Sequence, residues 1–285
     1  MTFAAVTMVY NEPNFLPIWC AHYSRQLGAE NCYIIDHGGD DGSTRGLDGF
    51  NVVRIPRSPL DEEKRARFIS RFASNLLEWH DGVIHTDVDE IAVPDPTLYT
   101  GLSDLMARNR HSVVNAIGWE IFHNPAEEPP IDLTAPILGQ RSWVKFASSM
   151  CKPLLIRGPV QWVPGFHAAD APIHFDDLYL FHLRYFDRDL GLARLAKTRA
   201  MAWANLEASS HQRLPDDTFR LWIEQAAAIP RVTGAPWRRD AEPVSGYLRR
   251  VLASETDFRT HPYNLDLHIT GHEMVEIPAP FRACF

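Results

Sequence analysis

Val83–Ile91 reads VIHTDVDEI, and it is the most informative stretch of the chain. Its apolar beginning predicts a buried strand, and Pro94 ends the apolar run that follows the acids. Asp87 and Asp89 therefore come just after the carboxyl end of a strand. Two carboxylates at this spacing can share one divalent cation, and such a cation can hold a diphosphate. The alternative is an ordinary turn with solvated acids, and the stretch by itself favours neither.

The residues around this stretch alternate between strand and helix patterns. This order predicts an α/β protein with a mostly parallel, doubly wound, Rossmann-like sheet. A helical region should follow it at the C-terminus. Strands are predicted at 4–9, 32–35, 52–55, 83–86, 112–117, 152–157 and 178–183. Helices are predicted at 15–27, 61–79, 98–108, 187–209 and 216–228.

The remaining segments show little periodicity. Residues 123–149 predict a loop, the tail after Pro230 is irregular, and 262–277 can add one or two strands. The change in pattern predicts a core over residues 1–185 and a helical extension over 186–285 packed on that core.

Composition excludes several classes of protein. The 285 residues are 45% hydrophobic and 22% charged, and their net charge of −8 provides no electrostatic footprint for nucleic acid. No apolar run approaches the roughly 20 residues of a membrane span. The N-terminus resembles a first strand rather than a signal peptide, and four cysteines without CxxC spacing predict free thiols. A cytoplasmic protein is therefore expected.

Polar residues follow the first two predicted strands, where ligands bind in open α/β sheets. Tyr10, Asn11 and Glu12 follow the first strand, and Asp36 and His37 follow the second. An aspartate at this place can accept a hydrogen bond from a nucleobase or a ribose. The acids immediately downstream fit a turn or a helix N-cap equally well.

The helix predicted at 61–79 is rich in basic residues. Lys64, Arg67, Arg71 and Asn75 lie three or four positions apart and so share one stripe. Most such stripes are exposed charged faces. Alternatively, Arg71 can lie beside a diphosphate.

Two downstream histidines are candidate metal ligands. Either His167 or His182 could complete a metal site begun by the aspartates, which would favour Mn²⁺ over Mg²⁺. A histidine on an apolar strand is also commonly a hydrogen-bonded core residue.

Two acids are candidate general bases, Glu120 and Asp170. Glu120 ends a predicted strand beside Trp119, and partial burial there would raise its pKa and suit base catalysis.

The segments VTMVYNE, IIDHGGDDGST and HTDVDE together resemble the GT-A fold glycosyltransferases. The resemblance is to the bacterial family 2-like branch, with similarity to family 92, and it is specific over residues 3–95. Weaker marks are Lys152-Pro153, Gly165-Phe166-His167 and His182. The chain has Gly39 where the family 2 turn usually has another residue, which affects the expected base or ribose pocket.

This resemblance implies a nucleoside-diphosphate sugar donor, UDP- or GDP-linked, and a glycan or other hydroxyl acceptor. It implies inverting chemistry, with Mn²⁺ or Mg²⁺ on Asp87 and Asp89 and a late histidine as third ligand. Val88 should lie beside the nucleotide, and aromatic faces of Trp119, Trp143 and Trp162 should bind the acceptor. Alternatives are a sugar nucleotidyltransferase, which would need a basic Gly-rich loop after the first strand, or a non-catalytic binding module.

Overall fold

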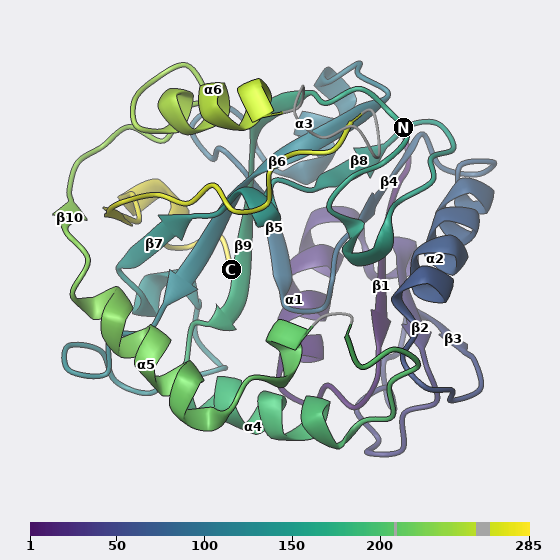
Figure 1. The fold of residues 1–285 in the computed structure, drawn as a ribbon. Helices are drawn as coiled ribbons and strands as arrows, with labels where there is room; N and C mark the ends of the chain where they lie inside the picture. The colour runs from purple at the N-terminus through teal and green to yellow at the C-terminus, as the bar shows by residue number, and fades with distance from the viewer. Residues whose placement is uncertain (208–209, 255–262) are drawn as a thin grey trace.

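The computed structural model describes residues 1–207, 210–254 and 263–285 of the chain. Its strands form one sheet with helices on both faces (Figure 1). The strands are β1 Phe3–Val9, β2 Cys32–Asp36, β3 Asn51–Arg54, β4 Gly82–His85, β5 Glu90–Pro94, β6 Val113–Phe122, β7 Trp143–Phe146, β8 Pro153–Ile156, β9 Phe175–Tyr185, β10 Arg231–Val232 and β11 Met274–Glu276. The α-helices are α1 Phe15–Leu27, α2 Glu62–Leu76, α3 Leu102–Arg108, α4 Arg188–Ala200, α5 Asp216–Ala227 and α6 Val244–Ser254.

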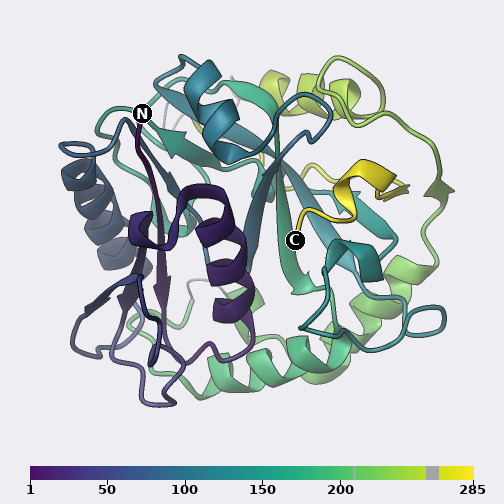
Figure 2. The same ribbon diagram turned by 180° about the vertical axis from the view of Figure 1, so that it is seen from behind.

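The N-terminal strands form the parallel part of the sheet, in the order β3-β2-β1-β4. Every residue of β1 is buried, because helices cover both of its faces. Ala5 and Val9 share a core cluster with α1, whereas Val6 and Met8 share another with α2. Figure 2 shows α1 on the face opposite to the view of Figure 1. The predicted α/β class is confirmed.

The rest of the sheet is mixed. β8 pairs antiparallel with β4 and β6, and β9 lies between β5, antiparallel, and β6, parallel. Sequence patterns missed β5, β7 and α6. β5 is a fully buried five-residue strand of only Glu-Ile-Ala-Val-Pro, so it shows no alternation of polar and apolar residues. β7 has four residues and lies inside the segment predicted to be a loop.

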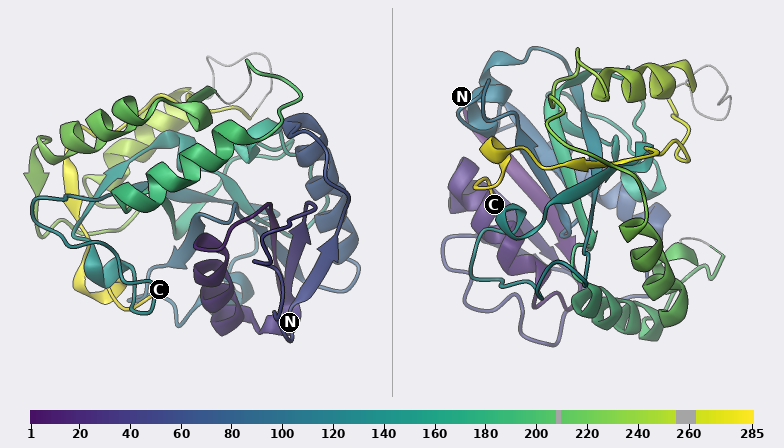
Figure 3. Two further views of the ribbon diagram at one scale, coloured as in Figure 1. Left: turned by 90° about the horizontal axis from the view of Figure 1, so that it is seen from below. Right: turned by 90° about the vertical axis from the view of Figure 1, so that its left-hand side faces the viewer.

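The C-terminal region places helices along one edge of the sheet. α4 and α5 run along the lower side of the molecule, where α5 packs on the carboxyl ends of β6 and β9 and α4 continues towards β1 (Figure 1, Figure 3). α4 is shorter than the helix predicted at 187–209, and Ser209 lies outside the described residues. β11 falls within the predicted 262–277 segment, of which Pro262 is likewise not described.

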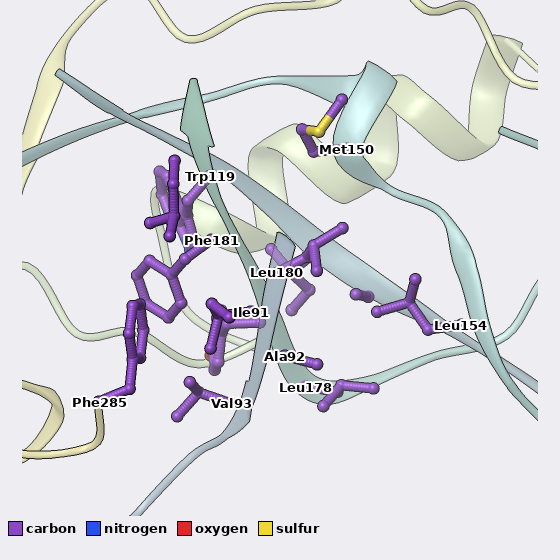
Figure 4. Packing of buried hydrophobic residues seen from close by; sticks show 14 of the residues in the cluster. Ile91, Ala92, Val93, Trp119, Met150, Leu154, Leu178, Leu180, Phe181 and Phe285 are labelled. Atoms are coloured by element: carbon purple, nitrogen blue, oxygen red, sulfur yellow. The ribbon is translucent and has the colours of Figure 1, made fainter. Parts of the chain in front are cut away.

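The main core draws on both predicted domains. Phe285 packs against Phe181 of β9 at a ring-centroid distance of 5.7 Å, and Ile91 of β5 lies in the same cluster (Figure 4). The division at residue 185 stays a prediction. All four cysteines are free thiols. Within the described ranges, no helix has both the length and the apolar character needed to cross a bilayer.

Candidate functional site

The turn between β4 and β5 carries Asp87 and Asp89. Trp19 of α1 donates its indole N–H to the Thr86 hydroxyl at 2.9 Å, which anchors the start of the turn. The backbone N–H of Glu90 donates to the Asp87 carbonyl at 3.0 Å, and the Asp87 N–H donates to a Glu90 carboxylate oxygen at 3.2 Å. These reciprocal bonds hold the turn in one conformation.

This turn forms part of a cleft of about 190 Å³ at the carboxyl ends of β1 and β4, beside α4. Predicted site residues that line it are Tyr10, Glu12, His37, Asp87, Val88, Asp89, His167 and His182. Its acidic lining residues are Glu12, Glu62, Asp87, Asp89 and Glu90. Its basic lining residues are Arg57, Arg65, Lys152, Arg184, Arg194 and Lys197.

Asp87 lies between two cations. Arg65 of α2 contacts one carboxylate oxygen, and the Lys152 ammonium lies 3.3 Å from the other. Lys152 also lies 2.5 Å from Glu90 and is almost fully buried. Burial alone would raise the pKa of Asp87, but Arg65 and Lys152 hold it well below its usual range. Burial raises the pKa of Glu90 despite Lys152.

Asp89 has cationic partners as well. Arg194 of α4 contacts Asp89 Oδ2, and His182 Nε2 lies 3.1 Å from the same oxygen. The other ring nitrogen of His182 lies 2.9 Å from Glu120. Asp89, His182 and Glu120 thus form a row of charged side chains. Strand register explains this row, because His182 of β9 pairs with Glu120 of β6 on one side and on the other with Glu90 of β5, the residue after Asp89.

The charges of this row follow from its neighbours. Burial would lower the pKa of His182, but Glu120 and Asp89 raise it to about 10, so the imidazole is a cation at neutral pH. Burial would likewise raise the pKa of Asp89, but Arg194 and His182 hold it well below its usual range. Glu120 does not line the cleft, but it contacts His182, which does.

Glu12 connects the end of β1 with α4. Its Oε1 atom lies 2.5 Å from the Lys197 ammonium and 3.2 Å from Arg194 Nε. Burial lowers the pKa of Lys197 although Glu12 opposes this effect. Tyr10 lies nearby under the Arg57 guanidinium, 3.6 Å from the ring centroid.

His167 and His182, the two predicted metal ligands, differ in charge. Burial lowers the pKa of His167 to about 3, so this side chain is neutral, with Nδ1 2.8 Å from the Ser149 carbonyl oxygen. His37 Nδ1 lies 3.1 Å from Arg57, and burial together with Arg57 lowers its pKa.

Asn11 and Asp36 organise the loop after β2 instead of lining the cleft. Asn11 has a left-handed backbone φ of 52°, and its amide contacts both the Asp40 carboxylate and the Asp40 backbone N–H. Asp36 is buried, accepts the Gly39 N–H at 2.6 Å, and pairs with Arg54 at 2.8 Å. Their expected contacts with a nucleoside stay a prediction.

Arg71, Asp170 and the three predicted tryptophans lie away from the cleft lining. Arg71 is exposed on α2, and Asp170 is exposed and accepts the Gln161 N–H at 2.6 Å. Trp119 is fully buried in the main core, stacked on Trp237 at 4.8 Å (Figure 4). Trp162 is buried too and donates to the Pro153 carbonyl at 2.9 Å. Buried rings offer no open face to a sugar, and this placement corrects the expected acceptor platform. Trp143 is half-buried on β7 under Arg231.

Comparison with known proteins adds limited information. No family profile matches the chain, and no curated protein does. One similar structure is the mannosyltransferase PcManGT from Pyrobaculum calidifontis in complex with GDP-Man and Mn²⁺, at 11% identity and a TM-score of 0.36, over 90% of this chain and 81% of that one.

Another is the mannose-1-phosphate geranyltransferase from Thermus thermophilus, at 10% identity and a TM-score of 0.32. The match covers 83% of this chain and 66% of that one, just under two thirds of its length. At TM-scores this low, neither similarity assigns a function to the chain. The resemblance to families 2 and 92 therefore stays a prediction.

The arrangement of the acids does not fit the predicted Mn²⁺ or Mg²⁺. Both oxygens of Asp87 and Oδ2 of Asp89 contact cationic side chains. A divalent ion bound there would have to displace these partners and lie beside their positive charges. Across the described ranges, no cluster of three or more His, Cys, Asp or Glu side chains is arranged to hold a metal.

Apart from Lys152, which belongs to a weaker mark of the resemblance, the cations of the cleft are the residues that sequence reasoning missed. The stripe through Arg71 is an exposed charged face, the first of its two interpretations. Ala66, Ile69 and Ala73 form the buried face of the helix, and Arg65 flanks it. Helical spacing relative to these apolar residues is the signal that could have found Arg65. Arg194 and Lys197 offered a weaker signal, since only Gly191 and Leu195 of α4 are buried.

Proposed function

We propose that the chain is a glycosyltransferase that moves a sugar from a nucleoside-diphosphate sugar to an acceptor hydroxyl. The observation that carries this proposal is the cleft at the carboxyl ends of β1 and β4, where buried and half-buried cations contact Asp87 and Asp89. Ligands of open α/β sheets bind at this edge, and cations there favour a phosphorylated ligand.

In the proposed reaction, the acceptor oxygen attacks the anomeric carbon while the bond to the diphosphate breaks. The leaving nucleoside diphosphate takes the bonding electron pair, and cationic side chains stabilise the charge that develops on it. The acceptor proton passes to a base, with inversion at the anomeric carbon. Glu120 stays the base predicted from the sequence, and it meets the cleft only through His182. The predicted metal ion has no step in this scheme, because the acids are engaged by side-chain cations.

The test is incubation of the protein with a panel of UDP- and GDP-sugars, followed by measurement of released UDP or GDP. Asp89→Asn should lower turnover by at least about tenfold, because Arg194 and His182 lose the charge that positions them. Glu78→Gln, an exposed acid outside the cleft, is the matched control and should keep full activity. Equal turnover in Asp89→Asn would show that this cleft is not the reaction site.

The alternatives give different products. A sugar nucleotidyltransferase would release pyrophosphate from a nucleoside triphosphate and a sugar phosphate, whereas the segment after β1 lacks the basic Gly-rich loop expected for it. A binding module would hold nucleotides without turnover of any donor.

A further inference from the structure

The cleft joins three cations from separate parts of the chain, of which Lys152 is buried and Arg65 and Arg194 are half-buried. Arg65 comes from α2, Lys152 from the residue before β8, and Arg194 from α4. Their side chains are 14%, 4% and 24% exposed, respectively. A buried cation is costly unless an anion lies beside it, and Asp87 and Asp89 supply that anion here.

The charge balance of the cleft also differs from that of the whole molecule. The chain carries −8, yet six basic and five acidic side chains line the cleft. An anionic ligand is therefore drawn to this place on an otherwise acidic protein. A divalent cation at Asp87 would be repelled by Arg65 and Lys152, which already contact both carboxylate oxygens of Asp87.

Building on the proposed function, we propose that Arg65, Lys152 and Arg194 bind the donor diphosphate directly, in place of a divalent cation. Guanidinium groups match phosphate oxygens with paired N–H donors, and an ammonium adds a point charge. Asp87 holds Arg65 and Lys152 in position, and Asp89 holds Arg194. The two acids are then positioning residues for the cations. When bound, the diphosphate is a further counter-ion, so each cation lies between an acid and the diphosphate.

The experiment is calorimetric titration of the full chain with UDP, GDP and inorganic pyrophosphate, after treatment with EDTA and again with Mn²⁺. We expect dissociation constants that agree within about threefold between the two conditions. Lys152→Gln and Arg194→Gln should each weaken binding by about tenfold or more, because each loses a charged hydrogen-bond donor.

Three controls separate charge from folding. Arg194→Lys keeps the charge but loses the paired N–H donors, so it should weaken binding less than Arg194→Gln, whereas a purely structural role of the guanidinium would make the two variants equal. Arg67→Gln on α2 and Arg188→Gln at the start of α4 remove exposed or half-exposed cations outside the cleft and should leave binding unchanged. Thermal melting of each variant shows whether it is folded.

Three results would overturn the inference, and they differ in what they leave of the proposed function. Binding that appears only with Mn²⁺ would disprove direct recognition by cations and leave the proposed glycosyl transfer standing. Failure of all three probes to bind under either condition, together with no donor turnover, would overturn both proposals. Unchanged affinity in folded Lys152→Gln and Arg194→Gln would also refute the inference.

Discussion

Single residues of the cleft take their chemistry from the charges beside them. Arg65 and Arg71 lie on the same helix, yet Arg65 reaches Asp87 and Arg71 is exposed. His182 and His167 both line the cleft, but one is a cation and the other is neutral. Residue type alone does not separate these cases, because burial and neighbouring charge set each state.

Glu120→Gln tests the electrostatics of this row. Removal of the carboxylate charge 2.9 Å from His182 Nδ1 should lower the pKa of His182 from about 10 by about one to three units. The change can be measured by NMR titration of the histidine ring signals, with His22 as an internal reference outside the cleft.

The sign of the linked stability change follows from the raised pKa. The paired imidazolium stabilises the fold fully below its unfolded pKa of about 6.5, and this contribution is lost as pH rises through about 10. The stability difference between wild type and Glu120→Gln should therefore shrink above pH 10. A His182 pKa that does not change in the variant would contradict the assigned contact.

At the scale of elements, α4 completes the cleft only because it packs closely on α5. Gly191 of α4 faces the buried ring of Phe219, and a Cβ at this position would also lie 3.0 Å from the Arg184 carbonyl oxygen. The absence of a side chain therefore lets α4 approach, which brings Arg194 and Lys197 to Asp89 and Glu12.

Gly191→Ala should overpack this contact. We expect a loss of about 1–3 kcal/mol in the free energy of unfolding, measured by urea denaturation. Nucleotide binding should weaken as well, because α4 carries Arg194. The double variant Gly191→Ala/Phe219→Leu should recover part of both losses. A fully stable single variant would mean that the helices are not packed this closely.

At the scale of the whole molecule, buried neutral histidines make the fold sensitive to acid. Burial lowers the pKa of His22 to about 4, and that of His85 and the half-buried His167 to about 3. Below pH 6.5 the unfolded chain binds protons at these positions while the folded chain does not. Their contribution to stability is therefore present above pH 6.5 and is lost as pH falls towards 4.

The free energy of unfolding should decrease from pH 6.5 to pH 5, by up to about 1.4 kcal/mol per pH unit for each such histidine. Urea denaturation at pH 7, 6 and 5 measures this slope. His22→Gln removes one titrating group, so the free energy of unfolding should depend less steeply on pH, by up to about 1.4 kcal/mol per pH unit. A variant with the same slope as the wild type would show that His22 is not buried in its neutral form.

The α/β class, the parallel strands of the N-terminal half, and the acids that follow the strand at 83–86 were predictable from the sequence. These features depend on local patterns, namely apolar runs, helical spacing and prolines, which are visible without the fold. The sequence could not determine β5 or β7, which are short strands held by pairing with distant ones.

Which cations contact Asp87 and Asp89 depends on the tertiary structure. Arg65, Lys152 and Arg194 are separated from Asp87 and Asp89 by 22, 65 and 105 positions in their pairs. The burial of Trp119 and Trp162 in the core likewise becomes visible only in the tertiary structure. The physical reason is that charge pairing and burial depend on distances between elements, and no pattern within one element contains those distances.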